Sequence, residues 1–483
     1  MQNRREFIKT LVIGSAGLAV LPAFSFGQKT SVGDPWAEMP KILARIKPPK
    51  FPKRDFVITK YGAVEGGEKL CTEAFAKAIA ACNKAGGGRV VVPKGVFLSG
   101  AIHLKSNVNL HVSEGATIKF SKDGKDFLPV VRTRWEGMDL MGHSAFIYAY
   151  EQTNIAITGT GTLDGQGKES FWKWHGNERY GGGGNKPGTI SQRADRAKLY
   201  EMMNNNVPIA ERIFGEGHYL RPNFITPFKC KNVLIEGVKI IDSPMWEVHP
   251  VLCENVTIRK LWISSHGPNN DGCDPESCKD VLIEDCYFDT GDDCIAIKSG
   301  RNDDGRRANA PTENIIVRGC TMKDGHGGIT VGSEISGGVR NLFAENCQLD
   351  SPNLDHALRV KNNAQRGGLL ENFYFRNITV GQVAHAVITI DFNYEEGAKG
   401  GHIPVMRNYV VENLKSGKSR YGVDIQGLAN APVYDIDLKN CTFDNVADGN
   451  VIANVKGVKL ENVKFNGQNL GELKHSSGTK AKS

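Results

Sequence analysis

The sequence predicts an all-β fold, a single domain of short strands that winds as a parallel β-helix. Short segments rich in β-branched residues recur along most of the chain, and most consecutive segments between residues 232 and 408 start about 23 to 36 residues apart. Almost every segment begins with Asn or Asp. A repeat of this length, built from short strands with the same residue type at one corner, is typical of a solenoid.

The repeated segments share an apolar–polar alternation. They are NVNLHV from residue 107, NIAITG from 154, NVLIEGVKI from 232, NVTIRKLWI from 255, DVLIEDCYF from 280, NIIVRGCTM from 314, NLFAENCQL from 341, NFYFRNITV from 372 and NYVVENLKS from 408, with looser copies from 433 and 455. One such unit cannot bury its apolar face alone, but stacked units bury it continuously and pair each strand with the next. Parallel pairing is expected because each coil returns the chain in the same direction. The corner Asn tolerates the left-handed conformation and can hydrogen-bond along the stack. A β-propeller is the alternative, but its units are longer, about 40 to 50 residues.

The chain before the repeats predicts an export signal and a lead-in. Residues 1–27 have a charged start, an apolar stretch of about 15 residues and a small-residue end. Their Arg4-Arg5 pair resembles a twin-arginine signal. A membrane anchor is the alternative, but a spanning helix needs roughly 20 apolar residues. We therefore expect an exported protein, periplasmic or secreted, with no membrane association after signal removal. Residues 28–54 are rich in Pro and Lys and read as a linker or lead-in.

The catalytic domain is predicted to span residues 55–470. Residues 56–64 are predicted to form a strand, and residues 86–97 a turn and a buried strand. Residues 72–82 are apolar at helical spacing, with Thr72 as the expected cap. A short helix in front of many strands fits a cap over the open end of a sheet, which would otherwise leave backbone groups unpaired.

A long insertion, residues 166–223, interrupts the repeat. It contains Trp172, Trp174 and Tyr180 and a predicted short helix near 192–203. Long loops inside a compact domain are usually functional or disordered. The aromatic side chains of the insertion could therefore stack on sugar rings, or the insertion could pack on the flank of the solenoid. The basic tail, residues 471–483, is expected to be disordered.

Composition narrows the class of protein without fixing it. The 483 residues carry a net charge of +7, which could attract an acidic polymer or be an ordinary solvated surface. We expect no nucleic-acid partner, and the oligomeric state is not predicted. The eleven cysteines fall in or beside strand segments, which favours buried apolar packing. A Cys273–Cys278 disulfide is an alternative, and the cysteine spacing matches no common zinc pattern.

Four polar motifs follow one another between residues 269 and 361. They are Asn269-Asn270-Asp271, Gly291-Asp292-Asp293, Gly325-His326-Gly327 and Arg359-Val360-Lys361. In a parallel solenoid, residues one coil apart lie about 4.8 Å from each other on the same face. The 21, 34 and 33 residues that separate Asp271, Asp292, His326 and Arg359 are each close to one coil. The motifs are therefore expected to form one compact patch. Each alone would be an ordinary turn or surface residue.

These motifs in this order resemble those of the polygalacturonases, glycoside hydrolase family 28, and the resemblance covers most of the chain. It implies an exo-acting bacterial type and a right-handed, pectin-lyase-like β-helix that hydrolyses α-1,4-galacturonosidic bonds of pectin by inversion, with no cofactor or metal. The partner is then an acidic polysaccharide or oligogalacturonide. Cleavage needs a protonated acid and a carboxylate that directs water. The resemblance makes Asp292 the general acid, Asp271 and Asp293 the pair that activates water, and His326 the group that supports the acid.

The resemblance also assigns the substrate contacts. Arg359 and Lys361 alternate along a strand and share one face, which suits a uronate carboxylate on the leaving-group side. Tyr394 would line the same subsite. An inverting pair predicts carboxyl groups about 6.5–9.5 Å apart. Loops such as the insertion favour exo over endo action, and Trp246, His249 and Lys298 are weaker pocket candidates.

Three alternatives to an exo-polygalacturonase stay open at this point. A branched rhamnogalacturonan would be an alternative substrate. A pectate lyase of the same fold would need a calcium cage and an arginine base. A non-catalytic polysaccharide-binding solenoid would have no reason to keep three acids and a histidine together.

Overall fold

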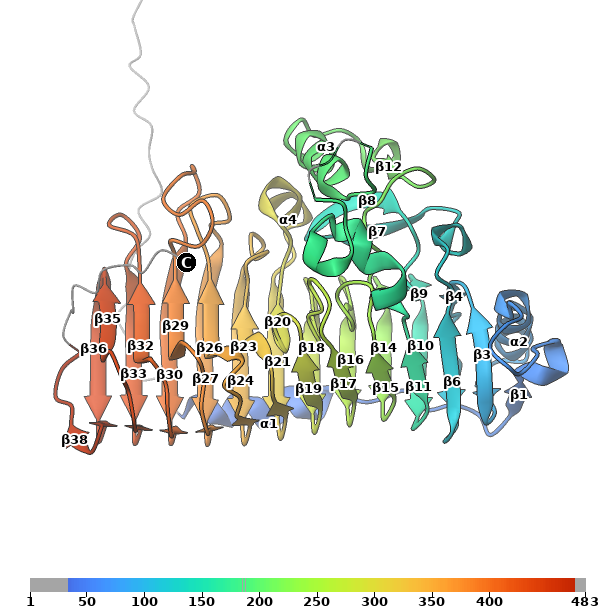
Figure 1. The fold of residues 1–483 in the computed structure, drawn as a ribbon. Helices are drawn as coiled ribbons and strands as arrows, with labels where there is room; N and C mark the ends of the chain where they lie inside the picture. Colours follow the sequence, from blue (N-terminus) through green and yellow to red (C-terminus); the bar gives the residue numbers. More distant parts are fainter. Residues whose placement is uncertain (1–33, 185, 187, 474–483) are drawn as a thin grey trace, which may run out of the picture.

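The computed structural model describes residues 34–473 except 185 and 187, and the chain forms a right-handed parallel β-helix. The expected signal segment and most of the tail lie outside the described residues. Within the described part, no helix is long and apolar enough to cross a membrane. Figure 1 shows the coils stacked along one axis, with the insertion above the N-terminal half.

Three parallel sheets form the faces of the β-helix. The first contains β1 (Asp55–Val57), β2 (Gly88–Val92), β5 (Val108–Val112), β10 (Thr153–Gly159), β14 (Lys231–Glu236), β16 (Glu254–Arg259), β18 (Lys279–Glu284), β21 (Thr312–Arg318), β24 (Val339–Glu345), β27 (Leu369–Arg376), β30 (Val405–Glu412), β33 (Val433–Lys439) and β36 (Val455–Glu461). The second contains β3 (Gly95–Ser99), β6 (Ala116–Phe120), β11 (Thr162–Asp164), β15 (Lys239–Ile241), β17 (Trp262–Ser265), β19 (Tyr287–Thr290), β22 (Thr321–Met322), β25 (Gln348–Leu349), β28 (Thr379–Val380), β31 (Lys415–Ser416), β34 (Thr442–Phe443), β37 (Lys464–Phe465) and the antiparallel β38 (Gln468–Asn469).

The third face carries the predicted site residues. It contains β4 (Ile102–His103), β9 (Ile147–Tyr150) and β13 (Ile225–Phe228), then β20 (Ile295–Ile297), β23 (Gly325–Val331), β26 (Leu354–Lys361), β29 (Ala386–Asp391), β32 (Tyr421–Gln426) and β35 (Asn450–Ala453). Single bridges at Val248 and Cys273 join its two parts.

The predicted corner residues form hydrogen-bonded ladders. Asn154, Asn232 and Asn255 each donate a side-chain bond to the ladder residue one coil before, at 2.7–3.0 Å. Asn314 donates likewise to Asp280 at 2.8 Å. All five have φ between 56° and 60°, the left-handed region. The ladder explains why Asn or Asp starts each segment, because these side chains tolerate this conformation and satisfy each other.

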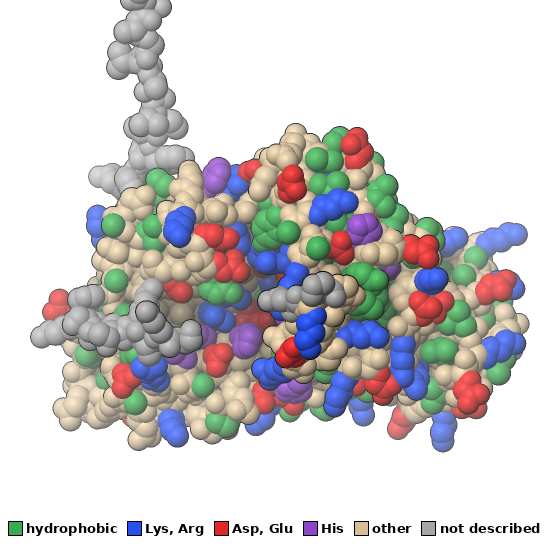
Figure 2. Space-filling model, turned by 45° about the horizontal axis from the view of Figure 1, so that its top comes forward, with side chains coloured by type: hydrophobic (Ala, Val, Ile, Leu, Met, Phe, Trp, Pro, Cys, Tyr) green, Lys and Arg blue, Asp and Glu red, His purple; other side chains and the backbone are tan. Residues whose placement is uncertain are grey.

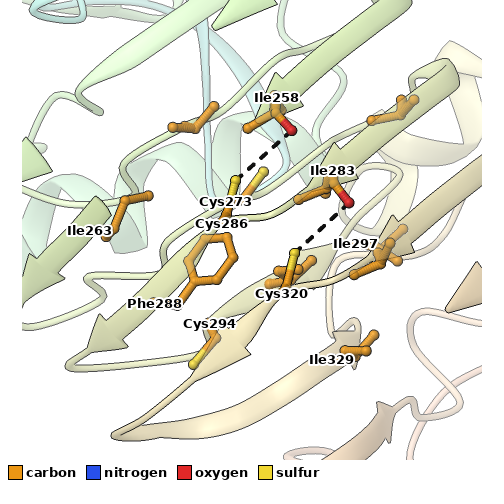
Figure 3. Close-up of a cluster of buried hydrophobic side chains, with 14 of the residues drawn as sticks. Ile258, Ile263, Cys273, Ile283, Cys286, Phe288, Cys294, Ile297, Cys320 and Ile329 are labelled. Carbon is orange, nitrogen blue, oxygen red and sulfur yellow. Dashed lines mark hydrogen bonds between the residues drawn. The ribbon is translucent and has the colours of Figure 1, made fainter. Parts of the chain in front are cut away.

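Buried aliphatic, aromatic and cysteine side chains fill the interior between the three faces. All eleven cysteines are buried and unpaired, which confirms the packing interpretation and excludes the Cys273–Cys278 disulfide in this structure. Figure 3 shows two of the thiols, Cys286 and Cys320, directed at the carbonyl oxygens of Ile258 and Ile283, both at 3.9 Å.

The N-terminal elements correct three expectations. The expected strand at 56–64 is short, because β1 gives way to a 3-10 turn that Gly62 ends with φ 100°. Helix α2 (Thr72–Lys84) is present, but Cys71 is its cap residue and the Thr72 hydroxyl accepts a bond from the Gly100 amide. The lead-in is not merely a linker: α1 (Glu38–Arg45), with Trp36 before it, packs on the outer face of the first sheet.

The insertion packs against the solenoid and carries α3 (Arg193–Asn204), close to the predicted helix. It also has short 3-10 turns and the strand β12 (Ile213–Phe214). β12 pairs with the hairpin of β7 (Val131–Trp135) and β8 (Met138–Gly142), which the sequence did not predict. Trp172 and Trp174 are buried rather than free to stack on a sugar. The last helix, α4 (Asn302–Ala308), follows β20 and borders the same region.

Candidate active site

The three predicted acids lie together on the third face. Two backbone hydrogen bonds join their coils: the Gly272 amide donates to the Asp293 carbonyl at 3.0 Å, and the Asp292 amide to the Asn270 carbonyl at 3.3 Å. One carboxylate oxygen from each of Asp271, Asp292 and Asp293 lies within 4.8 Å of the others. The side-by-side arrangement predicted from a spacing of one coil is therefore confirmed.

The nearest oxygens of these acids lie closer together than the 6.5–9.5 Å predicted between the carboxyl groups of the acid and the base. The separation of the carboxyl groups themselves stays a prediction. Asp292 and Asp293 are neighbours in sequence, and Asp271 is one coil away, so the stacking distance of the solenoid limits their separation. The glycine before the pair has a packing role. A Cβ on Gly291 would lie 2.5 Å from the Gly267 carbonyl oxygen, so only glycine lets the two coils approach this closely.

Asp293 is fully buried and bound to cations. Its Oδ2 accepts a hydrogen bond from Lys361 Nζ at 2.6 Å, and its Oδ1 lies 3.1 Å from Thr330 Oγ1 and 3.6 Å from an Arg359 Nη. A buried carboxylate is stable as an anion only when it is paired and hydrogen-bonded in this way. Lys361 therefore fixes Asp293 in place, in addition to any contact it makes with substrate.

Asp292 and His326 form a hydrogen-bonded pair across adjacent coils, with Oδ1 and Nδ1 3.0 Å apart. Burial would raise the pKa of Asp292, but the hydrogen bond and the charge of His326 outweigh it, so the pKa lies below its ordinary value. The same hydrogen bond and charge raise the pKa of His326 to about 9. The imidazole of this pair therefore binds a proton more strongly than the carboxyl group does.

Asp271 differs from Asp292 in its affinity for a proton. Burial raises its pKa well above the ordinary value, and the charges of Asp292 and Asp274 add to this. Lys298 Nζ, 3.6 Å from Asp271, opposes the shift but also lies 3.5 Å from Asp274 and 3.2 Å from Glu334. Asp271 thus binds a proton more strongly than Asp292, and such a difference is the basis of acid and base roles in one site.

Arg359, Lys361 and Tyr394 lie together on the C-terminal side of the acids. The two cations share the outer face of β26, as predicted, and their charged groups lie 5.9 and 5.5 Å from the Tyr394 ring centre. Arg359 also donates to the His326 carbonyl at 3.3 Å. Its side chain keeps 16% exposure, whereas Lys361 keeps 8%, so Arg359 is the more accessible of the two.

A pocket of about 240 Å³ lies between the insertion and the loop after β29, and the predicted site residues that line it are Asp271, Asp292, His326, Arg359, Lys361 and Tyr394. Asp293 is fully buried and is not among the lining residues. Figure 2 shows a hollow in this region where basic, acidic and histidine side chains gather. The other lining residues are Glu136, Arg196, Trp246, Asn269, Lys298, Arg301, Ser333, Glu334 and Glu395. Lys298 and Trp246 thus belong to the pocket, with Nζ 4.2 Å from the ring centre. His249 does not line it: it is buried and bonded to Glu276 at 2.7 Å.

Sequence reasoning missed four of these residues. Glu136 comes from the β7–β8 turn, Arg196 from α3, and Arg301 and Glu334 from the turns after β20 and β23. Arg301 and Glu334 come within ten residues after the Asp292-Asp293 and His326 motifs, so their positions in the sequence could have indicated the site. Nothing in the local sequence of Glu136 or Arg196 points to the site.

Two groups in the described part of the chain have metal-ligand atoms close together: the three acids, and His266 with Asp289 and Asp324. In the first group, Asp293 already binds Lys361 and Asp292 already binds His326. That neither group holds a metal in the working protein stays a prediction.

Comparisons with known proteins agree with this site. The model of "Glycosyl hydrolases family 28" matches residues 215–466, more than half of the chain. The chain therefore belongs to this family and is a glycoside hydrolase of the polygalacturonase type. A crystal structure of an exopolygalacturonase from Thermotoga maritima is 46% identical, covers 90% of this chain and 96% of its own, and has a TM-score of 0.86.

Two sequence relatives are more distant. A probable polygalacturonase of Vitis vinifera is 27% identical over 80% of this chain and 73% of its own length. An exo-poly-alpha-D-galacturonosidase of Dickeya chrysanthemi is 27% identical over 70% of this chain and 57% of its own length.

Proposed function

We propose that this protein is an exo-acting polygalacturonase that hydrolyses α-1,4-galacturonosidic bonds with inversion. The observation that carries the proposal is a group of three carboxyl groups with oxygens within 4.8 Å of one another, one of them bonded to His326. The group borders a pocket that has Arg359 and Lys361 on one side and the insertion on the other. The similarity to the Thermotoga maritima exopolygalacturonase supports it.

In the proposed mechanism, Asp292 delivers a proton to the leaving oxygen. That proton comes from the Asp292–His326 pair, which holds one proton between its two groups. The other two acids, Asp271 and Asp293, hold the attacking water on the opposite face of the sugar, and Asp271 or Asp293 accepts its proton. Arg359 binds the carboxylate of the leaving sugar, and Lys361 holds Asp293 in place through their hydrogen bond.

The raised pKa of Asp271 makes it the rival candidate for the general acid, and the leaving group distinguishes the two. An aryl galacturonide with an acidic phenol needs little protonation as the bond breaks. Asp292→Asn should therefore lose far less activity on this substrate than on trigalacturonate, whereas Asp271→Asn should lose a similar factor on both. The reverse pattern would assign the acid to Asp271.

Exo action is tested by the products formed on polygalacturonate. A monomer or dimer from the first time point, absent for Asp292→Asn, supports the proposal. A ladder of mixed oligomers at early times would show that the pocket admits internal bonds and would make the protein an endo-polygalacturonase.

The same assay addresses the other candidates. Product formation that persists in chelator argues against a calcium-dependent lyase. Turnover of a branched rhamnogalacturonan but not of polygalacturonate would change the substrate, and binding without turnover would indicate a non-catalytic solenoid.

We also propose that residues 1–27 direct export through a twin-arginine route, on the basis of Arg4, Arg5 and the apolar stretch that follows. Replacing both arginines with lysine should leave the protein in the cytoplasm of an expressing bacterium. Unchanged export would refute the assignment.

A further inference from the structure

We propose that Arg196, on α3 of the insertion, binds the carboxylate of the terminal galacturonate, across the cleaved bond from Arg359. This inference rests on the proposed function, because it names the residue that recognises the chain end in that pocket. In this proposal the insertion determines substrate specificity in addition to forming one side of the pocket.

A polygalacturonate chain carries one carboxylate on every sugar, so the sugar on each side of the cleaved bond needs a cationic partner. Three cations near the insertion are already engaged. Lys298 has carboxylates of three residues within 3.6 Å and a side-chain exposure of 3%. Arg301 is bound to Glu136 at 3.2 Å and Glu334 at 2.6 Å.

The third engaged cation is Arg221, which is fully buried. It donates to the carbonyls of Pro244 and Pro268 and to the side chains of Gln192 and Asn269, at 2.6–3.0 Å. To bind Arg221, a substrate carboxylate would have to displace these hydrogen bonds and move the segments that bury the side chain. None of these three cations is therefore available to a substrate carboxylate.

Arg196 is differently placed. Its side chain keeps 40% exposure and lines the pocket. Its Nε donates to Glu136 Oε2 at 3.0 Å, while its two terminal nitrogens have no hydrogen bond to any residue in the described part of the chain. The guanidinium carbon lies 5.2 Å from the Tyr200 ring centre, one helical turn further along α3. The Arg196 guanidinium is thus fixed by the hydrogen bond at Nε and by the Tyr200 ring on one of its faces. Its two terminal nitrogens are free to bind a carboxylate bidentately.

A chain of ion pairs links Arg196 to the acids. Glu136 Oε2 accepts from both Arg196 and Arg301, Glu334 joins Arg301 to Lys298, and Lys298 lies beside Asp271. This chain fixes the position of α3 relative to the reacting centre. Glu136 is therefore a positioning residue, because it acts only through the two arginines. A preorganised contact loses less side-chain freedom on binding than a mobile surface arginine would.

The test compares two trigalacturonates, one unmodified and one with its non-reducing terminal carboxylate methylated. Binding to the inactive Asp292→Asn enzyme is measured by calorimetry at moderate ionic strength, with and without Arg196→Gln. We expect the parent to prefer the unmodified sugar by about 10- to 100-fold, and Arg196→Gln to remove most of that preference. Lys198→Gln, an exposed cation of the same helix, is the matched control and should keep the preference.

Two results would overturn the proposal. One is an equal loss of affinity for both sugars in Arg196→Gln, which is the signature of a structural role. The other is a preference that survives the substitution or was never present, including absence of binding to either sugar. Turnover of unmodified trigalacturonate by the unaltered enzyme is measured separately, and its absence refutes the proposed function without deciding the binding ratio.

Discussion

Replacing Lys361 with methionine should destabilise the protein strongly, because it leaves the fully buried Asp293 without its main partner. Lys361 Nζ lies 2.6 Å from Asp293 Oδ2, and the two side chains are 8% and 0% exposed. Methionine keeps much of the length and apolar surface of lysine, so the change mainly removes the charge and the hydrogen bond.

The distances give the size of the effect. At an effective dielectric constant of about 20, opposite charges 2.6 Å apart attract by about 6 kcal/mol. Arg359, 3.6 Å from Asp293, remains and retains about 5 kcal/mol of attraction. Desolvation of the lysine is also relieved. The net cost should therefore lie near the value for breaking a buried ion pair, about 3–5 kcal/mol.

The assay is a double-mutant cycle with Asp293→Asn, using equilibrium unfolding in guanidinium at pH 7. The asparagine has no charge to leave unpaired, so Lys361→Met should cost much less in that background, with a coupling of about 2–3 kcal/mol. Additive costs would refute the argument that the pair is energetically linked. An Asp293 already neutral in the native protein would produce that outcome.

Three further predictions follow from burial and pKa. Because Asp292 raises the pKa of His326 to about 9, activity that needs the charged imidazole should fall as pH rises through about 9. The pH–activity profile of His326→Asn should lack this decline. A decline centred near pH 6.5 in the unaltered enzyme would contradict the pairing of His326 with Asp292. Burial raises the pKa of Glu247 well above 4.5, so the folded state keeps a proton that the unfolded state loses, and stability should decline by about 1.4 kcal/mol per pH unit above 4.5 until that pKa is reached. Glu247→Gln should remove this decline, which is measured from the guanidinium unfolding midpoints of both proteins at pH 5, 6 and 7. If the midpoints of the two proteins change equally with pH, Glu247 is not a buried neutral acid. Trp36→Ala should cost about 3–5 kcal/mol of stability without changing activity, because Trp36 packs on Phe343 and Tyr374 away from the pocket, and a loss of activity in the folded variant would link the lead-in to catalysis.

The parts of the fold that repeat were predictable from the sequence. Each coil is a local unit with its own apolar alternation, and the corner Asn needs only its own backbone conformation and the next Asn in the stack. The same regularity placed the site. Asp271, Asp292 and His326 are spaced by one coil each, so a solenoid brings them together whatever else it contains.

The parts that depend on contacts between unlike segments were not predictable. Glu136 reaches Arg301 across 165 residues and Arg196 across 60, and no periodicity relates those positions. The packing of the lead-in on the first sheet is of the same kind, since Trp36 meets side chains more than 300 positions later. An apolar or charged residue in an irregular segment has many possible partners, and only the assembled structure selects one.

The sequence by itself therefore determined the solenoid, its parallel direction and the grouping of acids, histidine and bases, because a repeating chain converts spacing along the sequence into neighbourhood in space. The tertiary structure alone decided how the pocket is closed and how its protons are distributed. Those properties arise from burial and from charges on separate segments: the same aspartate side chain has a raised pKa at position 271 and a lowered one at 292 because their surroundings differ.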